Sequence, residues 1–492
     1  MEALMIPKPG HIFDRDGEWR GLADFVEDQR PEVTLGVVSG RRRQGKTYLL
    51  RALSEATGGF FFEAVEATEA ESIRMFGAAL ARHAGSPADF SFATWADALT
   101  YLFSLDRGQP VPLIIDEFPF LVSASPSLAS LLRREIDRRG PSQGAGSRAR
   151  VLLCGSAMSV MGNLLAGNAP LRGRSGLEMV IQPFGYRDAA EFWEAADPKL
   201  AALIYSIVGG TPAYRRQFVR DDAPAGIRDF DAWVVRALLT PDRPLLREAR
   251  YLLAGETDIR DPALYQSVLA AIAQGSTTWG GIASYIGRKA ADIAHPLHVL
   301  EDCDLVAREE DVFRNGRSQY RITEPLITFY SAIMRPRWAD LEQGMGRQVW
   351  QDSKPTFLSR VVGPHFEMLC REFVRRYGRE LFGQPVGRVG AGMVSDPAGK
   401  KQIEIDVAVV APAESGEKRR ILSLGEAKWG EVMGIRQVDR LRRARSLLDV
   451  KGFDTNDTVL ACYSAAGFDH ALRAAADAEG VLLVDLDRLY AR

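Results

Sequence analysis

The 492-residue sequence has few cysteines, few lysines, almost no net charge and no long apolar run. Its four cysteines lie far apart without a CxxC pair, which excludes a disulfide framework or zinc cage and predicts buried free thiols. With 62 basic and 64 acidic residues, any contact with nucleic acid must come from a local basic surface. No stretch approaches about eighteen uninterrupted apolar residues and no signal peptide begins the chain, so we expect a cytoplasmic protein without a membrane role.

The length and composition indicate several globular domains. A chain of 492 residues is too long for one ordinary core. Hydrophobic residues make up 46% and charged residues 26%, which excludes a disordered or fibrous chain. Only ten residues are lysine, and two of them, Lys46 and Lys428, fall within the two strongest chemical motifs.

The first third of the chain alternates β-rich runs with helical ones. Runs that are apolar throughout are typical of strands buried on both faces of a parallel sheet. The expected strands are 33–39, 60–64, 113–115, 151–154 and 178–181, and helices over 69–83 and 128–139 are expected to cover them. From about residue 186 the strand signals fade and helical ones replace them.

The segment Gly40–Thr47, GRRRQGKT, matches the phosphate-loop pattern GxxxxGK[ST] between an apolar strand and a helical run. The two glycines let backbone N–H groups turn toward phosphates at a helix N-terminus. Lys46 is expected to reach the β- and γ-phosphates of ATP, and the Thr47 hydroxyl to ligate Mg²⁺. The residues expected to bind the nucleotide in this loop are Gly40, Arg43, Gln44, Gly45, Lys46 and Thr47.

Asp116 and Glu117 follow the apolar run 113–115. A strand ending there delivers Asp116 to the carboxyl edge of the sheet, where it can hold the water shell of Mg²⁺. Glu117 is then placed to activate the attacking water. An Asp-Glu pair alone is a weak signal, and the phosphate loop seventy residues earlier strengthens it.

Residues 264–323 predict three helices and a hairpin: 265–273, 278–286 and 290–303, then strands 305–309 and 318–322 around Asn315-Gly316. This is the element order of a winged helix-turn-helix. The hairpin arginines Arg308, Arg314, Arg317 and Arg321 are candidate DNA contacts, and a role in packing against protein is an equal alternative.

The last unit is predicted as helix 365–377, strands 402–410 and 420–426, helix 435–448, strand 458–463, helix 469–478 and strand 481–486. Glu404 and Asp406 share one face of a strand, as do Glu426 and Lys428. Carboxylates with one lysine suit a Mg²⁺- or Mn²⁺-dependent phosphodiesterase.

The spacing from Asp406 to Glu426-Ala427-Lys428 matches the loose D…(D/E)xK pattern of restriction-endonuclease-like nucleases. Asp406, Glu426 and Lys428 are therefore the candidate catalytic residues. A basic stripe of Arg436, Arg440 and Arg443 on the following helix suits a phosphate backbone or is only a solvated face.

The N-terminal motifs resemble the archaeal-type ATPases of the AAA+/STAND group. The resemblance is carried by Gly155-Ser156 at the end of a third strand, Pro170–Arg174, Gly209–Pro212 and Phe13–Asp16. It implies that Ser156 senses the γ-phosphate and that Arg174, or less favourably Arg172, stabilises transferred charge within the subunit or across a subunit boundary. Glu18-Trp19 replaces the usual Glu-Leu pair of the family.

The C-terminal motifs resemble the nuclease-like domain that accompanies this ATPase type. The matching segments are Phe366-Glu367, Glu404–Val407 and Gly425–Trp429. The resemblance implies a metal site whose ligands come from Glu367, Glu404, Asp406 and Glu426.

The expected fold is a multidomain α/β protein: a P-loop NTPase parallel sheet (1–185) with a helical lid (186–260), a winged helix-turn-helix (261–335) and a restriction-endonuclease-like domain (345–492). The leading hypothesis is an ATPase coupled to a metal-dependent nuclease that acts on DNA, with homo-oligomers forming on ATP binding. A regulatory switch with a non-cleaving C-terminal domain is the alternative, and an ATP-driven assembly factor is a third.

Overall fold

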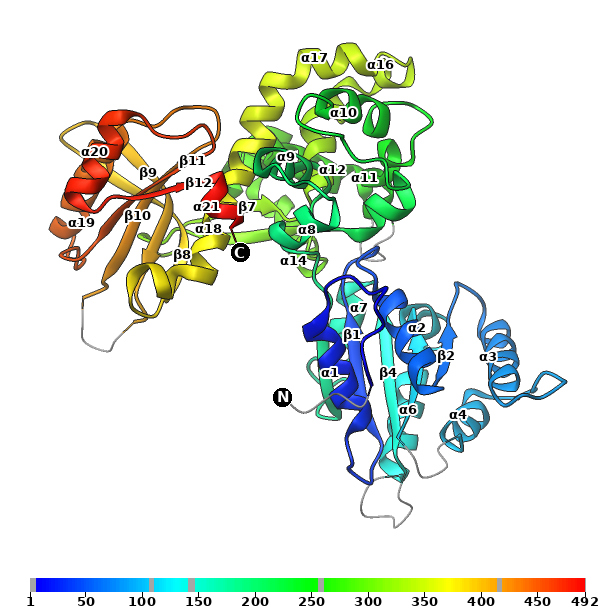
Figure 1. The fold of residues 1–492 in the computed structure, drawn as a ribbon. Coiled ribbons are helices and arrows are strands. Elements are labelled where there is room, and N and C mark those ends of the chain that lie inside the picture. Colours follow the sequence, from blue (N-terminus) through cyan, green and yellow to red (C-terminus); the bar gives the residue numbers. More distant parts are fainter. Residues whose placement is uncertain (1–5, 106–109, 140–146, 255–260, 414–417, 492) are drawn as a thin grey trace. The chain divides into compact units, whose positions relative to one another are not determined.

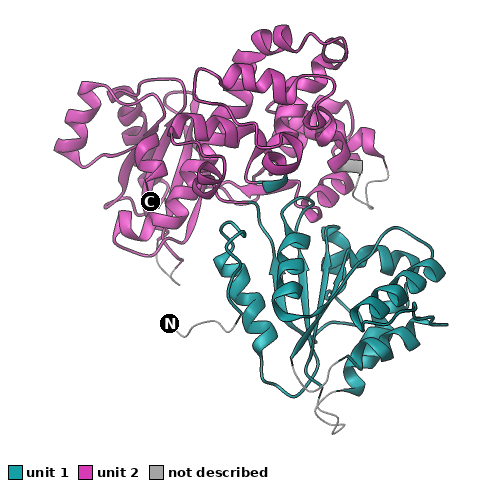
Figure 2. Ribbon diagram, turned by 45° about the vertical axis from the view of Figure 1, so that its right-hand side comes forward, with its two compact units in different colours: residues 1–183, 211–213, 255–258 teal, residues 184–210, 214–254, 259–492 magenta. Residues whose placement is uncertain are grey.

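The computed structural model describes residues 6–105, 110–139, 147–254, 261–413 and 418–491 (Figure 1). They form two compact units (Figure 2). The first holds the described residues up to Pro183 together with Thr211–Ala213. The second holds Phe184–Gly210, Tyr214–Ala254 and the described residues beyond.

The first unit contains a five-stranded parallel sheet in the order β2-β3-β4-β1-β5. The strands are β1 (Thr34–Ser39), β2 (Phe60–Glu63), β3 (Val111–Asp116), β4 (Ala149–Gly155) and β5 (Ser175–Val180). Alternate residues of β1 enter two apolar clusters, Leu35 and Val37 on one face and Val38 on the other. The predicted parallel sheet is confirmed, because the continuous apolar runs are buried on both faces.

Helices cover both faces of this sheet (Figure 1). They are α1 (Asp16–Glu27), α2 (Lys46–Thr57), α3 (Glu69–His83), α4 (Trp95–Phe103), α5 (Phe118–Ala124), α6 (Leu128–Arg138) and α7 (Met158–Asn163). The start of α3 follows from its cap, since the Thr68 side chain accepts a hydrogen bond from the Glu71 N–H.

The second unit begins with helices α8 (Tyr186–Phe192), α9 (Pro198–Val208), α10 (Phe230–Leu238) and α11 (Pro244–Ala254), and a π-helical turn at Tyr214–Phe218. Next come α12 (Pro262–Ala273), α13 (Trp279–Ile286), a 3₁₀ turn (Ala290–Ile293), α14 (Ala294–Asp302) and the antiparallel hairpin β6 (Val306–Glu310) and β7 (Ser318–Ile322). One helix over 290–303 was the expectation. Pro296 lacks the N–H that a continuous helix needs, so it is tolerated only in the first turn of a new helix.

A helical stretch leads from this hairpin to a second sheet. It comprises α15 (Pro325–Phe329), π-helical Tyr330–Met334, 3₁₀ Arg335–Arg337, α16 (Trp338–Glu342), α17 (Gly346–Thr356), π-helical Phe357–Val362 and α18 (Gly363–Phe382). The sheet that follows contains β8 (Arg388–Asp396), β9 (Lys401–Val410), β10 (Ile421–Lys428), β11 (Val459–Ser464) and β12 (Leu482–Asp485). Helices α19 (Ile435–Val450), α20 (His470–Glu479) and α21 (Leu486–Tyr490) alternate with its later strands.

The second sheet is mixed, in the order β12-β11-β10-β9-β8. Strands β8, β9 and β10 pair antiparallel, while β10, β11 and β12 pair parallel. Helix α18 packs on one face through Phe366 and Leu369, and α19 on the other through Val438 and Leu441. The sheet is therefore buried on both sides.

Strand β8 was not expected from the sequence, and the tip of the β6–β7 hairpin packs against it. Val312 is buried in the same apolar cluster as Val394 and Ile403. Its N–H donates to the Ala391 carbonyl at 3.0 Å. A Cβ at Gly392 would lie 2.4 Å from the Phe313 ring, so this glycine makes room for the hairpin. The tip of the hairpin therefore packs against protein, which was one of the two alternatives for the role of the hairpin.

In the described part of the chain, no helix combines the length and the apolar character that a membrane span requires. The four cysteines are free and buried, as the sequence predicts.

Candidate functional site

The phosphate loop lies between the end of β1 and the start of α2. Gly40 and Gly45 have φ of 147° and 88°, values that favour glycine. A Cβ at Gly40 would lie 2.5 Å from the Ile181 carbonyl oxygen, so a side chain there would clash with backbone. Arg43, inside the loop, also has a positive φ of 71°. The loop is thus wound tightly ahead of the positive end of the α2 dipole.

Lys46, at the start of α2, is buried, with 4% of its surface exposed. Its Nζ donates to the carbonyl oxygens of Gly40 at 2.7 Å and Arg41 at 2.9 Å. Burial lowers the pKa of Lys46, and the carboxylates of Asp116 and Glu117 oppose that effect. The ammonium group therefore lies against its own loop, near Asp116 at the end of β3 and Glu117 directly after it.

Asp116, at the end of β3, is fully buried. Its Oδ1 accepts a hydrogen bond from the Glu117 N–H at 2.9 Å. Its Oδ2 is buried and accepts no hydrogen bond from an N–H or O–H group among the described residues. Burial and the same carboxylate, with which the buried Cys154 thiol interacts, raise the pKa of that thiol. Because a buried carboxylate oxygen without an N–H or O–H donor is costly, the Asp116 Oδ2 fits a water of a Mg²⁺ shell. Thr47, half-buried at the first turn of α2, is the other residue in the expected Mg²⁺ set.

Glu117 and Ser156 come together at the same edge of the sheet. The Ser156 hydroxyl lies 3.1 Å from each carboxylate oxygen of Glu117, to which it donates a hydrogen bond. Glu117 itself has a positive φ of 50°, a conformation that turns its side chain out of the strand direction. The structure thus brings together Lys46, Asp116, Glu117 and Ser156, all predicted from sequence.

The loop has further partners in two other N-terminal motifs, Gly209–Pro212 and Phe13–Asp16. The Gln44 side chain is buried, and its Nε2 donates to the Thr211 hydroxyl at 3.1 Å. Pro212 lies next to Gly45. The Arg15 guanidinium donates to the Gln44 carbonyl at 3.3 Å. The Gly-Gly-Thr-Pro and Phe-Asp-Arg-Asp motifs were the available signals, but which loop residue each one touches required the structure.

Arg174 does not lie at the phosphate edge. It precedes β5, whose first residue Ser175 pairs with Leu35, whereas Val180 pairs with Ser39 beside the loop. At about 3.3 Å per residue the two edges are roughly 15 Å apart. The Arg174 Nε pairs with Asp137 at 2.7 Å. Arg174 therefore lies at the edge of the sheet opposite the phosphate loop of its own subunit. Its expected role in stabilising transferred charge stays a prediction, and action across a subunit boundary is the alternative that fits this position. Arg172 donates to the nearby Gly167 carbonyl.

The second group of predicted residues lies where β9 and β10 separate. Their ladder ends at the pair Val407 and Gly425. On the other side of β9, Asp406 and Val407 together oppose Ala391 of β8, which makes a β-bulge at Asp406. A bulge re-aims a side chain. The Asp406 Oδ2 accepts a hydrogen bond from the Ala427 N–H at 2.9 Å, in place of a backbone pair.

Asp406, Glu426 and Lys428 converge in this notch. Lys428 Nζ lies 3.6 Å from Asp406 Oδ2 and 3.4 Å from Glu426 Oε1. Burial raises the pKa of Glu426, and the cations beside it act in the opposite direction. Desolvation of Lys428 is outweighed by Asp406 and Glu426, so its pKa is raised and it carries a proton.

Arg440 of α19 also enters the notch. Its Nη1 lies 2.8 Å from Glu426 Oε1, and its Nη2 donates to the Glu404 carbonyl at 3.1 Å. Arg443, on the same helix, pairs with Asp396 at 2.8 Å. Arg440 is half-buried and Arg443 exposed, and each pairs with a buried carboxylate. Both alternatives for this basic stripe, a phosphate contact and a solvated face, stay predictions.

The four candidate metal ligands do not form a ready metal site. Among the described residues, no group of three or more His, Cys, Asp or Glu side chains is arranged to hold a metal ion. Two cations, Lys428 and Arg440, already pair with Glu426. Glu404 is exposed, and Glu367 on α18 lies 3.9 Å from Arg371. Glu426 Oε2 nevertheless stays buried without a hydrogen-bond partner in the part of the chain that the structure describes.

The comparisons with known proteins do not assign the chain to a family. No family model matches the chain. An uncharacterized protein of Methanocaldococcus jannaschii, MJECL04, is 25% identical over 365 residues, which cover 73% of this chain and 76% of that protein.

Solved structures that the chain is similar to include a Walker-type ATPase and an ORC2 protein. The Walker-type ATPase PABY2304 of Pyrococcus abyssi has a TM-score of 0.49 and 19% identity over 65% of this chain and 96% of its own. The ORC2 protein of Aeropyrum pernix, in its ADPNP–ADP complexes, has a TM-score of 0.41 and 16% identity over 71% and 97%. The strand order and phosphate loop described above define the first unit as a P-loop NTPase fold.

Proposed function

We propose that the first unit binds and hydrolyses ATP. The observation that carries this proposal is the buried Oδ2 of Asp116, without an N–H or O–H donor among the described residues, at the sheet edge that also holds Lys46 and the hydrogen-bonded pair Glu117 and Ser156. Backbone N–H groups of the loop and the Lys46 ammonium bind the phosphates. Glu117, oriented by Ser156, accepts a proton from the attacking water. Thr47, and Asp116 through water, would hold Mg²⁺, which would supply positive charge next to the phosphates.

We further propose that the second unit contains a metal-dependent nuclease centre that acts on DNA. Its support is the convergence of Asp406, Glu426 and Lys428 at a bulge between splayed strands, with one carboxylate oxygen left unpartnered. Asp406 and Glu426, with Glu404 and Glu367 as further ligands, would hold Mg²⁺ or Mn²⁺ through carboxylate oxygens. The Lys428 ammonium orients the attacking water.

The domain assignment belongs to the same proposal. We infer a helical lid over 186–260, a winged helix over 261–335 and a restriction-endonuclease-like domain over 345–492. Three helices followed by the β6–β7 hairpin support the winged helix. The order of α18, the three antiparallel strands, α19 and β11 supports the nuclease-like domain. The N-terminal motifs support an AAA+/STAND ATPase that forms homo-oligomers on ATP binding.

One observation favours a second candidate, a regulatory switch whose C-terminal domain does not cleave. Lys428 and Arg440 already neutralise Glu426 in the structure. A centre in which the protein's own cations satisfy the carboxylates can hold a nucleic-acid or protein partner without a catalytic metal.

The experiment that separates the two candidates incubates purified protein with linear and single-stranded DNA, with Mg²⁺ or Mn²⁺ and with or without ATP. Lys46→Ala and Asp406→Ala are measured beside the natural sequence. Cleavage that is lost in Asp406→Ala establishes the nuclease, and its response to Lys46→Ala shows whether ATP controls it. ATP turnover without any cleavage selects the switch.

A further inference from the structure

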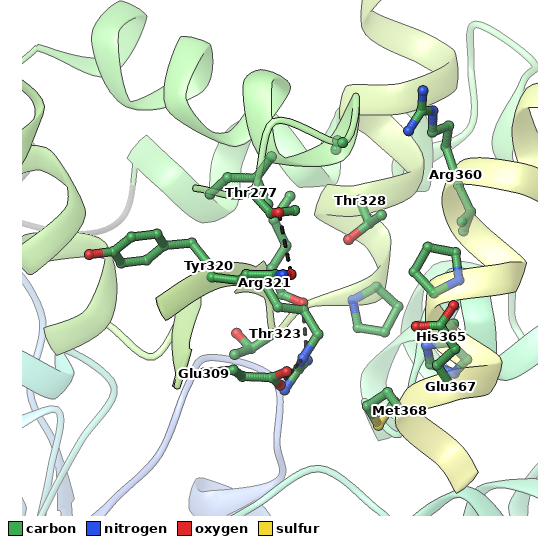
Figure 3. Close-up of a pocket in the computed structure, with 18 of the residues that line it drawn as sticks. Thr277, Glu309, Tyr320, Arg321, Thr323, Thr328, Arg360, His365, Glu367 and Met368 are labelled. Atoms are coloured by element: carbon green, nitrogen blue, oxygen red, sulfur yellow. Dashed lines mark hydrogen bonds and ion pairs between the residues drawn. The ribbon is translucent and has the colours of Figure 1, made fainter. Parts of the chain in front are cut away.

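A cavity of about 180 Å³ opens beside the carboxylate centre of the second unit (Figure 3). Its walls come from the β6–β7 hairpin, from the helical segment 357–371 and from Glu404 of β9. Figure 3 shows Glu309 and Arg321 on one side of this space and His365 and Glu367 on the other. The cavity has room for several water molecules, and hence for a phosphate group.

Glu309, on β6, is surrounded by guanidinium groups. The Arg321 Nε lies 2.7 Å from its Oε1, and the Arg371 Nη2 lies 3.8 Å from its Oε2. Burial by itself raises the pKa of Glu309, but Arg321, Arg371 and Arg375 together hold it below its ordinary value. One ionised carboxylate therefore stands among three arginines.

Arg371, on α18, lacks the hydrogen bonds that a buried guanidinium needs. It is 5% exposed, and its Nη1 donates to the main-chain oxygen of Asp406 at 3.0 Å. Its Nε is buried and has no partner among the described residues. The carboxylates of Glu309 and Glu367, at 3.8 and 3.9 Å, are too far for hydrogen bonds. Since buried donors are normally satisfied, Arg371 is built to receive a further acceptor.

We propose that Arg321 and Arg371 form a subsite for one phosphate of a nucleic-acid strand, and that Glu309 occupies this subsite with its carboxylate in the present structure. Guanidinium groups bind phosphate through paired N–H donors, as they bind a carboxylate. The assignment deepens the proposed nuclease centre and rests on it, because the bond from Arg371 to Asp406 places the bound phosphate beside that residue.

The neighbouring residue provides a matched control. Glu310 follows Glu309 on β6, so its side chain points to the opposite face of the strand. It pairs with Arg388 at 3.1 Å, away from Arg371. Glu309→Gln and Glu310→Gln each remove one negative charge, and the two positions are adjacent in sequence. An effect of overall charge on DNA binding is therefore the same in both variants.

The test measures binding of a fluorescein-labelled single-stranded DNA oligonucleotide by anisotropy at several salt concentrations without ATP. All variants carry Asp406→Ala, which prevents cleavage and keeps the main-chain oxygen that Arg371 contacts. Removal of the competing carboxylate in Glu309→Gln should tighten binding about tenfold. One added phosphate contact should steepen the slope of log K against log salt by about 0.7. Glu310→Gln should change neither quantity comparably, and adding Arg321→Gln to Glu309→Gln should abolish the gain.

Equal affinity and equal salt slope in the Glu309 and Glu310 variants would overturn the subsite, as would failure of every variant to bind. Circular dichroism melts check that each variant folds. If Arg321→Gln does not fold, Arg321→Lys replaces it, because lysine keeps the charge but lacks the planar guanidinium fork. The outcomes separate from those of the proposed function. Tighter DNA binding by Glu309→Gln, together with no cleavage by the natural sequence, supports the phosphate subsite and contradicts the nuclease. Cleavage by the natural sequence without tighter binding by Glu309→Gln supports the nuclease and contradicts the subsite.

Discussion

The packing of the hairpin tip against β8 predicts the effect of Val312→Ala. Val312 is 1% exposed, and its side chain belongs to the apolar cluster of the second sheet. The substitution removes two methyl groups from this cluster. Their transfer is worth about 0.8 kcal/mol each. With a contribution from the cavity left behind, docking of the hairpin should weaken by about 2 kcal/mol.

This loss should appear as faster local opening. The Val312 N–H donates to the Ala391 carbonyl at 3.0 Å, and the Met393 N–H to Asp311 Oδ2 at 3.1 Å. Since every 1.4 kcal/mol is a factor of ten, the amides protected by docking should exchange about thirtyfold faster. Hydrogen–deuterium exchange on peptides that cover 306–322 and 388–396 measures this rate.

Val450→Ala is the matched control, because Val450 is 85% exposed at the end of α19. The same chemical change there should alter stability by no more than about 0.5 kcal/mol. Equal exchange rates of the hairpin and β8 peptides in the two variants would refute the docked hairpin. The hairpin would then be free for the DNA contact that was the other expectation from its arginines.

Three further substitutions test the two centres. Ser156→Ala removes the hydroxyl that orients Glu117, so the rate of steady-state ATP hydrolysis should fall about tenfold. Nucleotide affinity, titrated separately, should be unchanged, and a parallel loss of affinity contradicts the positioning role. Arg174→Gln should leave the ATP turnover of dilute protein unchanged. A role of Arg174 across a subunit boundary requires that ATP turnover per subunit of the natural sequence rise with protein concentration, so turnover that does not change with concentration excludes that role. Arg440→Gln removes the cation 2.8 Å from Glu426 and should tighten Mn²⁺ binding, measured by calorimetry, about tenfold relative to Arg443→Gln; unchanged affinity argues against Glu426 as a ligand.

The phosphate site was predictable because its parts are local in sequence or linked by a simple rule. Gly40–Thr47 is a contiguous motif between a strand and a helix. Asp116 ends another strand of the same sheet, and parallel strands bring their carboxyl ends to one edge. The position of Arg174 was not predictable, because motif resemblance says nothing about the edge of the sheet on which a residue lies. The register of β5 against β1 decides that.

The missed strand β8 shows a different limit. Gly390 and Gly392 weaken its strand signal, since glycine is depleted in strands. The structure explains them, because a Cβ at Gly390 would lie 2.9 Å from Val312 and one at Gly392 would meet Phe313. The two glycines make room for a hairpin that lies some eighty residues earlier in the chain. No local sequence pattern predicts that contact.

The sequence by itself determined the residue types that bind phosphate and the strands that carry them, because hydrophobic periodicity and short motifs act over a few neighbouring residues. It also paired Glu426 with Lys428 through the two-residue repeat of a strand, whereas the bulge at Asp406, which turns that side chain toward them, is a feature of the tertiary structure. Only the tertiary structure decided which charges meet there. Arg440, Arg371 and Glu309 reach the centre from two helices and a hairpin, and such contacts depend on packing between segments that are distant in sequence.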